Sequence, residues 1–143
     1  MNKGVFIMGK GKVINSWEIK PLVLDHTYSS KMLLDSIVAE AETIQINEGT
    51  LKKGCKTNGG VHTANEIYYV VKGEAVIHLD NETQDIKPGS IVFIPAGVFH
   101  SLDNKSATED FVILTFWINA SDNEVYNMRI KAWGKSFKTI YED

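Results

Sequence analysis

Two histidines and one glutamate are the residues of this sequence whose types and spacing best suit chemistry. His62 and Glu66 are separated by three residues in a stretch with turn character, which begins at Gly60. A short turn there would place His62 at the end of one strand and Glu66 at the start of the next, so both side chains can aim at one point. Imidazole and carboxylate groups can bind a metal ion or move a proton.

His100 is the third residue of this group. It follows a sharp turn that Pro95 and Gly97 are expected to form. On a strand leaving that turn, Val98, His100 and Leu102 share one face, because side chains alternate along a strand. His100 is therefore a polar residue on an otherwise apolar face, and it is a candidate to join the first two residues.

Composition limits the classes of protein to which the chain can belong. Its 143 residues are 43% hydrophobic and 23% charged, with no linker or repeat, which predicts a single domain over 1–143. The net charge of −3 gives no basic surface for nucleic acid. The longest apolar run, 111–118, is short of the ~20 residues of a membrane span, and no signal peptide is recognised. The single cysteine, Cys55, excludes an internal disulfide and fits a cytoplasmic location.

Short runs rich in Val, Ile, Phe, Tyr and Thr alternate with turn-forming residues along the chain. This pattern predicts an all-β sandwich or barrel. Strands are expected at 41–46, 67–71, 74–79, 84–87, 90–94, 98–102 and 110–118. The last of these is apolar on both faces, so we expect both faces to be covered, one of them by a pocket and the other by a second sheet or subunit.

Four further segments give weaker expectations. Lys72-Gly73 predicts a tight hairpin between the strands at 67–71 and 74–79, and 47–49 is interpreted as a turn. Residues 31–40 are a helix candidate, although 32–34 could equally be a strand. Residues 125–141 are expected to form a strand or to pack on the outside of the barrel.

Two segments resemble the two sequence motifs of the cupin superfamily. The second motif, 89–104, is matched at every defined position, which here are Gly89, Pro95, Gly97, His100 and Asn104. The first motif, at about 54–73, is matched from His62 onward through Glu66 and Gly73. The resemblance implies a double-stranded β-helix, a jelly-roll-like barrel, here with N- and C-terminal extensions. It also implies a homodimer.

The chain departs from the family pattern at Gly60. Typical metal-binding cupins use three histidines and a glutamate, and Gly60 stands where the first histidine is expected. The resemblance then leaves His62, Glu66 and His100 as ligands of one divalent metal ion, which could be Fe, Mn, Zn, Ni or Co. Two histidines and a carboxylate with open positions are also the donor set of non-haem iron oxygenases.

Further residues are candidates for the pocket around this site. Tyr68 shares its face with Glu66, so it could contact a substrate or serve as an acid. The other candidates are Gln45, Phe93, Phe111 and Trp117, as polar contact or pocket wall. The remaining histidines, His26 and His78, are interpreted as non-functional.

The sequence favours a metal-dependent enzyme acting on a small oxygen-rich molecule that chelates the metal, of the dioxygenase, isomerase or lyase type. A non-catalytic module that binds a sugar or small acid is the alternative. A third alternative is a metal-free, epimerase-like cupin in which a histidine acts as base. The expected partners are a small molecule and a second copy of the chain, with no nucleic acid and no membrane.

Overall fold

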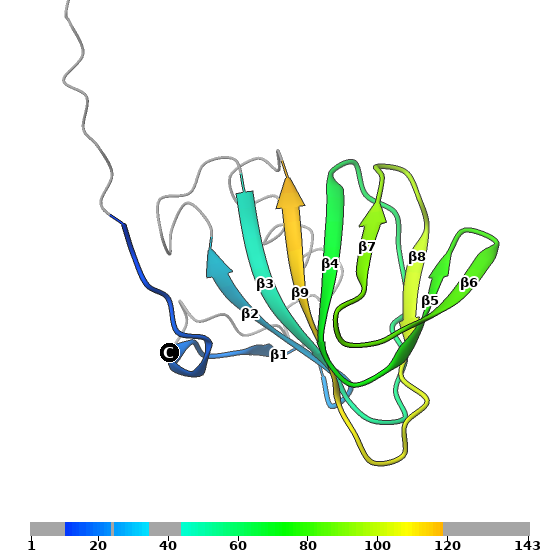
Figure 1. The fold of residues 1–143 in the computed structure, drawn as a ribbon, viewed down its shortest axis with the longest axis horizontal. Coiled ribbons are helices and arrows are strands. Elements are labelled where there is room, and N and C mark those ends of the chain that lie inside the picture. The colour runs from blue at the N-terminus through cyan, green and yellow to red at the C-terminus, as the bar shows by residue number, and fades with distance from the viewer. Residues whose placement is uncertain (1–10, 24, 35–43, 119–143) are drawn as a thin grey trace, which may run out of the picture.

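The computed structural model describes residues 11–23, 25–34 and 44–118, which are built almost entirely from antiparallel strands (Figure 1). A short 3₁₀ helix, η1 (Ser16–Glu18), precedes them. The strands are β1 (Leu22–Val23), β2 (Tyr28–Leu34), β3 (Ile44–Leu51), β4 (Asn65–Lys72), β5 (Ala75–Leu79), β6 (Glu82–Ile86), β7 (Ile91–Ile94), β8 (His100–Asp103) and β9 (Phe111–Ile118). In these ranges no helix is long and apolar enough to cross a membrane.

The strands form two sheets that face each other. The larger sheet has six strands in the order β1-β2-β3-β9-β4-β7, and the smaller has three in the order β6-β5-β8. Side chains from both sheets meet in one buried cluster, so the sheets are the two walls of a barrel. The predicted all-β, jelly-roll-like barrel is confirmed.

The centre of the larger sheet is a regular three-strand ladder of β3, β9 and β4. Every second residue of β3 and β9 is buried, as expected for strands with one face toward a core. In the register of the ladder, Trp117 lies opposite Gln45 on one side and opposite Glu66 on the other. Opposite residues project to the same face, so these three side chains form one row inside the barrel.

The chain changes sheet at Gly73, and the hairpin predicted around Lys72-Gly73 is wrong. β4 pairs with β7 and β9, whereas β5 pairs with β6 and β8. Gly73 has a φ of 77°, and a Cβ there would meet the carbonyl oxygen of Asp110 at 2.6 Å. Glycine therefore serves two needs here, a left-handed backbone and a close approach to the chain that enters β9.

Before β4, strand pairing overrides the helix expected from residue 31 and the turn expected at 47–49, whereas the alternative of a strand at 32–34 is confirmed. Residues 31–34 of the helix candidate belong to β2, which pairs with β3; 35–40 lie outside the described residues. The turn expected at 47–49 lies within β3, where Asn47 pairs with Met32 on one side and Thr115 on the other. Backbone hydrogen bonds to two neighbouring strands thus hold this segment extended. The segment 125–141 lies outside the described residues.

Asn104 connects the loop between β8 and β9 to the end of β3. Its side chain is fully buried and donates hydrogen bonds to the carbonyl oxygens of Leu51 at 3.2 Å and Glu109 at 3.0 Å. Its Oδ1 accepts a hydrogen bond from the Ser106 amide at 3.1 Å. One amide side chain therefore pairs with three backbone groups, of which the carbonyl of Leu51 belongs to a fully buried residue.

Replacement of Asn104 by alanine should destabilise the fold. The Asn104→Ala variant leaves these backbone groups without this hydrogen-bond partner. We therefore expect a loss of about 2–4 kcal/mol in the free energy of unfolding. Urea denaturation followed by circular dichroism measures it. Asn58 is exposed and serves as the matched control, so Asn58→Ala should unfold like the wild type. Equal unfolding midpoints for the two variants would contradict this role of Asn104.

Candidate metal centre

Three different parts of the fold bring His62, Glu66 and His100 together. Glu66 is the second residue of β4, and the alternation of that strand turns it into the barrel. His100 is the first residue of β8 and is paired with Gly60 through two backbone hydrogen bonds of 3.1 Å. That pairing holds the segment containing His62 beside β8. The three side chains therefore meet at one point as predicted, although His62 lies in an irregular segment between the Gly60 bridge and β4 rather than at the end of a strand.

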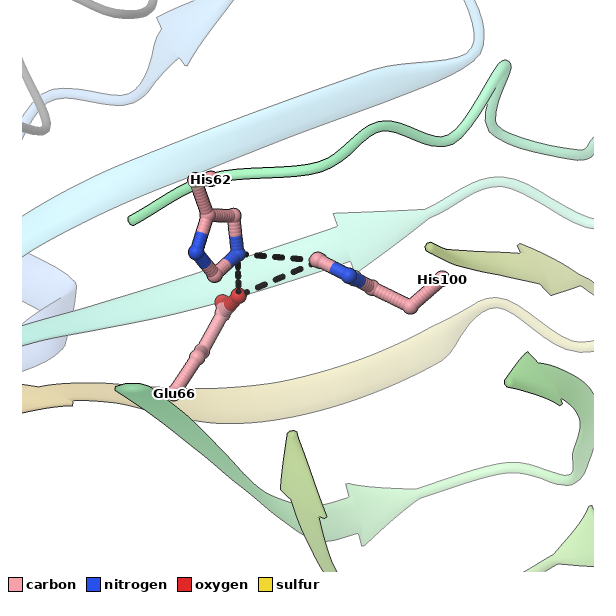
Figure 2. A group of neighbouring side chains, drawn as sticks. All are labelled: His62, Glu66 and His100. Atoms are coloured by element: carbon pink, nitrogen blue, oxygen red, sulfur yellow. Dashed lines mark hydrogen bonds and ion pairs between the residues drawn. The ribbon is translucent and has the colours of Figure 1, made fainter. Parts of the chain in front are cut away.

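The three side chains point toward one another (Figure 2). The Nε2 atom of His62 lies 2.9 Å from Oε2 of Glu66 and 3.2 Å from Nε2 of His100. Nε2 of His100 lies 3.3 Å from the same carboxylate oxygen. The three side chains are at most 9% exposed. Three atoms that could ligate a metal ion thus form a small, buried triangle.

Backbone carbonyls fix the orientation and the tautomer of both rings. Nδ1 of His62 lies 2.7 Å from the carbonyl oxygen of Ala64, and Nδ1 of His100 lies 3.0 Å from that of Val98. A carbonyl oxygen only accepts, so each Nδ1–H donates. In a neutral ring, Nε2 then carries a lone pair and faces the centre. Metal-bound histidines commonly donate their other ring N–H to a backbone carbonyl in this way.

Two imidazole lone pairs and a carboxylate in mutual contact require a positive charge between them. Burial lowers the pKa of His100, but the hydrogen bond and negative charge of Glu66, together with the Val98 carbonyl, outweigh it. The pKa of His100 therefore lies above its ordinary value of 6.5. The cluster stabilises positive charge, as a cation site must.

The spacing of the donors fits one metal ion. Metal bonds of about 2.1 Å hold two ligand atoms about 3.0 Å apart in octahedral geometry and about 3.4 Å apart in tetrahedral geometry, to within a few tenths of an ångström. The three separations of 2.9, 3.2 and 3.3 Å agree with that geometry. His62, Glu66 and His100 are also a group of metal-ligating residue types with donor atoms close enough for one ion.

Gly60 leaves open space on one side of the cluster. Because Gly60 and His100 exchange backbone hydrogen bonds, side chains at the two positions would project to the same face. A Cβ at Gly60 would meet nothing within 4 Å, and its φ is not positive. Neither packing nor backbone conformation therefore demands glycine at this position.

The other pocket candidates are distributed over both faces of the larger sheet. Gln45, Tyr68 and Trp117 lie buried on the inner face, and the rings of Trp117 and His62 are 4.4 Å apart. Phe111 is fully buried in the apolar core cluster. Phe93 is 57% exposed and faces away from the side that carries Glu66, because it alternates with Ile94.

The remaining histidines lie apart from the cluster. His78 alternates with the buried Ile77 on β5 and pairs with Thr83 and Ser101. His26 is exposed before β2. Neither belongs to the group of candidate ligands found among the described residues.

Two polar residues of the inner face were not identified from the sequence. Asn47 and Thr115 are at most 2% exposed and lie opposite each other on β3 and β9. They have the same strand parity as Gln45 and Trp117, and this parity is the signal that could have found them. Interpreting 47–49 as a turn concealed that parity.

Comparison with known proteins agrees with this architecture. A relative from Methanocaldococcus jannaschii, itself an uncharacterized protein, is 30% identical over 88 residues, which are 61% of this chain and 70% of that protein. The oxalate-binding protein of Thermotoga maritima is 28% identical over 108 residues, covering 71% of this chain and 89% of that one.

Solved structures with the same fold cover most of the chain. KdgF from Halomonas sp. superposes with a TM-score of 0.69 at 16% identity, covering 80% of this chain and 98% of that one. A predicted oxalate decarboxylase from Thermotoga maritima gives a TM-score of 0.67 at 25% identity, covering 76% and 100%. The cupin domain model matches residues 47–118, half of the sequence, and the chain belongs to the cupin family.

Proposed function

We propose that this cupin binds one divalent metal ion through His62, Glu66 and His100 and acts on a small oxygen-rich molecule at that ion. The observation that carries the proposal is the buried triangle of three acceptors at 2.9–3.3 Å, with both imidazoles fixed by backbone carbonyls. Three ligands leave further coordination positions for a chelating substrate. The metal would supply polarisation of a bound oxygen, or activation of water or dioxygen.

The residues of the chain have separate tasks in this proposal. His62, Glu66 and His100 hold the ion, and Trp117 packs against His62 as part of the pocket wall. Tyr68 is the candidate proton carrier, because its ring lies 6.2 Å from that of His100 on the inner face of β4. Gln45 lies beside Trp117 in the same row and is a candidate polar contact.

Small carboxylic acids are the substrate class to test first. The relative from Thermotoga maritima is an oxalate-binding protein, and a structural neighbour is a predicted oxalate decarboxylase. A two-oxygen chelator such as oxalate would fill two positions that the three protein ligands leave open. The same relative also supports a module that binds such an acid without turnover.

The outer face of the larger sheet supports the proposal of a homodimer. Ile91 and Tyr69 lie opposite each other on β7 and β4, as do Phe93 and Ile67. Ile91 is 71% and Phe93 57% exposed, and Val71 adds to the same face. An apolar, uncharged patch of this kind is self-complementary and suits a two-fold interface between copies of the chain.

Metal content tests the centre directly. Untagged native protein should carry about one equivalent of iron, manganese, nickel, cobalt or zinc in elemental analysis. Single replacement of His62, Glu66 or His100 by alanine should weaken metal affinity by at least about tenfold, since even loss of a residue that supports a ligand costs that much. His78→Ala should retain the metal. Wild-type protein that stays metal-free after soaking and desalting would refute the metal centre.

Turnover separates an enzyme from a binding module. Metal-loaded protein is incubated with oxalate and related hydroxy- and keto-acids, and products are followed by NMR. An enzyme should form product at a rate that falls to background in His62→Ala. Tight binding in calorimetry with no product under air or nitrogen would instead support the binding module.

Light scattering tests the homodimer. At micromolar concentration we expect twice the mass of the chain for the wild type, and the mass of one chain for the Ile91→Glu/Phe93→Glu variant, because burying two carboxylates opposes association. Val13, 89% exposed outside the patch, supplies the control Val13→Glu. A wild-type mass equal to that of one chain would contradict the proposal of a homodimer.

A further inference from the structure

Polar side chains occupy two neighbouring rows on the inner face of the larger sheet, at the end that carries the candidate ligands. The first row contains Gln45, Trp117 and Glu66, which lie side by side on β3, β9 and β4. The second row contains Asn47, Thr115 and Tyr68 on the same strands. All six are at most 7% exposed.

The same face becomes apolar farther from the cluster. The next row contains Gly49, Ile113 and Val70, and after it Leu51 lies opposite Phe111. The core cluster that joins the two sheets includes these apolar side chains. Apolar residues would stabilise a barrel along its whole length, because burial of polar groups is costly. Two polar rows at one end therefore indicate a function beyond stability.

Among the described residues, two of these side chains have no hydrogen-bond partner. The Nε1 atom of Trp117 and the Oγ1 atom of Thr115 are shielded from solvent and make no hydrogen bond. Each such group costs about 1–3 kcal/mol when left unpaired. Bulk water does not reach these atoms, so either an enclosed water or a bound molecule has to supply the partners.

We infer that Trp117 and Thr115 recognise an uncharged oxygen of the bound molecule, such as a hydroxyl or carbonyl, beyond the atoms that chelate the metal. This inference rests on the proposed function. An indole N–H only donates, so Trp117 requires an acceptor, and a hydroxyl such as that of Thr115 can donate or accept. The contact of Trp117 with His62, at a ring separation of 4.4 Å, keeps this group next to the chelated end of the molecule.

The charge of the rows selects an uncharged oxygen over a second carboxylate. Glu66 is the only ionised side chain in the two rows, and its charge is directed to the ligand cluster. No lysine or arginine is among the buried residues of the described ranges. A carboxylate enclosed beside these rows would lose its hydration without a compensating cation, which is costly.

Three α-hydroxy acids with the same chelating group test the inference. Lactate carries a methyl group beyond the chelate, glycerate a hydroxymethyl group, and malate a second carboxylate. Isothermal titration calorimetry with racemic acids measures their affinity for the full chain loaded with Co²⁺. We expect glycerate to bind about tenfold more tightly than lactate, the effect of one well-placed hydrogen bond, and malate no more tightly than lactate.

Two conservative variants test whether Trp117 and Thr115 cause the preference for glycerate over lactate. Trp117→Phe keeps an aromatic ring and removes Nε1, and Thr115→Val keeps the shape and removes the hydroxyl. Each should reduce the ratio of glycerate to lactate affinity, to nearly one in Trp117→Phe, with both affinities measured on the same Co²⁺-loaded variant. Trp17, 77% exposed, gives the matched control Trp17→Phe, which should keep the full preference.

The outcomes separate failure of this inference from failure of the proposed function. Equal affinity for lactate and glycerate, or a preference for glycerate that survives both wall variants, would overturn the inference and leave the metal chelate intact; enclosed water then pairs with Trp117 and Thr115. Tighter binding of malate than of glycerate would also overturn it. Metal-loaded protein that binds none of the three acids would overturn both the inference and chelation of hydroxy acids.

Discussion

The close contact between His62, Glu66 and His100 is the constraint on which the rest of the inner face depends. Two imidazole nitrogens and a carboxylate oxygen lie within 3.3 Å of one another, and a positive charge is needed to hold them there. The carbonyls of Ala64 and Val98 prevent the rings from turning their N–H groups inward. The barrel walls around the cluster exclude the water that would otherwise separate these groups.

Strand alternation and register determine which other side chains lie beside this cluster on the inner face. Once Glu66 faces inward, the register of the ladder places Trp117 and Gln45 beside it, and Tyr68, Thr115 and Asn47 one row deeper. A shift of one residue in β9 would turn the apolar outer residues into the barrel and expose the polar ones. The positions of these side chains and the register of the strands are therefore fixed by the same backbone hydrogen bonds.

Much of the cluster could be predicted from the sequence, because its information is local. His62 and Glu66 lie on either side of one turn, and His100 follows a turn marked by proline and glycine, so spacing alone brings them to strand ends. The outer position of Phe93 was missed because alternation divides a strand into two faces without saying which one is inside. The partner strands, β4 and β9, decide that question.

The failed expectations depend on contacts between distant parts of the chain. Gly73 resembles a hairpin glycine, and only its close approach to Asp110 shows that it directs the chain into a second sheet. Asn47 and Gly49 have the composition of a turn, yet β2 and β9 hold them extended from both sides. Pairing partners more than 60 residues away in sequence, such as Thr115 for Asn47, leave no local signal.

Gly60 and the polar rows together define where a bound molecule fits. Glycine within paired backbone costs about 0.5–1 kcal/mol relative to alanine, and nothing in the packing or backbone at Gly60 requires it. A side chain here would have projected to the same face as His100, so no side chain from this position packs against the cluster. Trp117 covers His62 from the β9 side, with the second polar row beyond it. A molecule that chelates the ion from the Gly60 side would therefore meet the cluster first, and its uncharged end would face the polar rows.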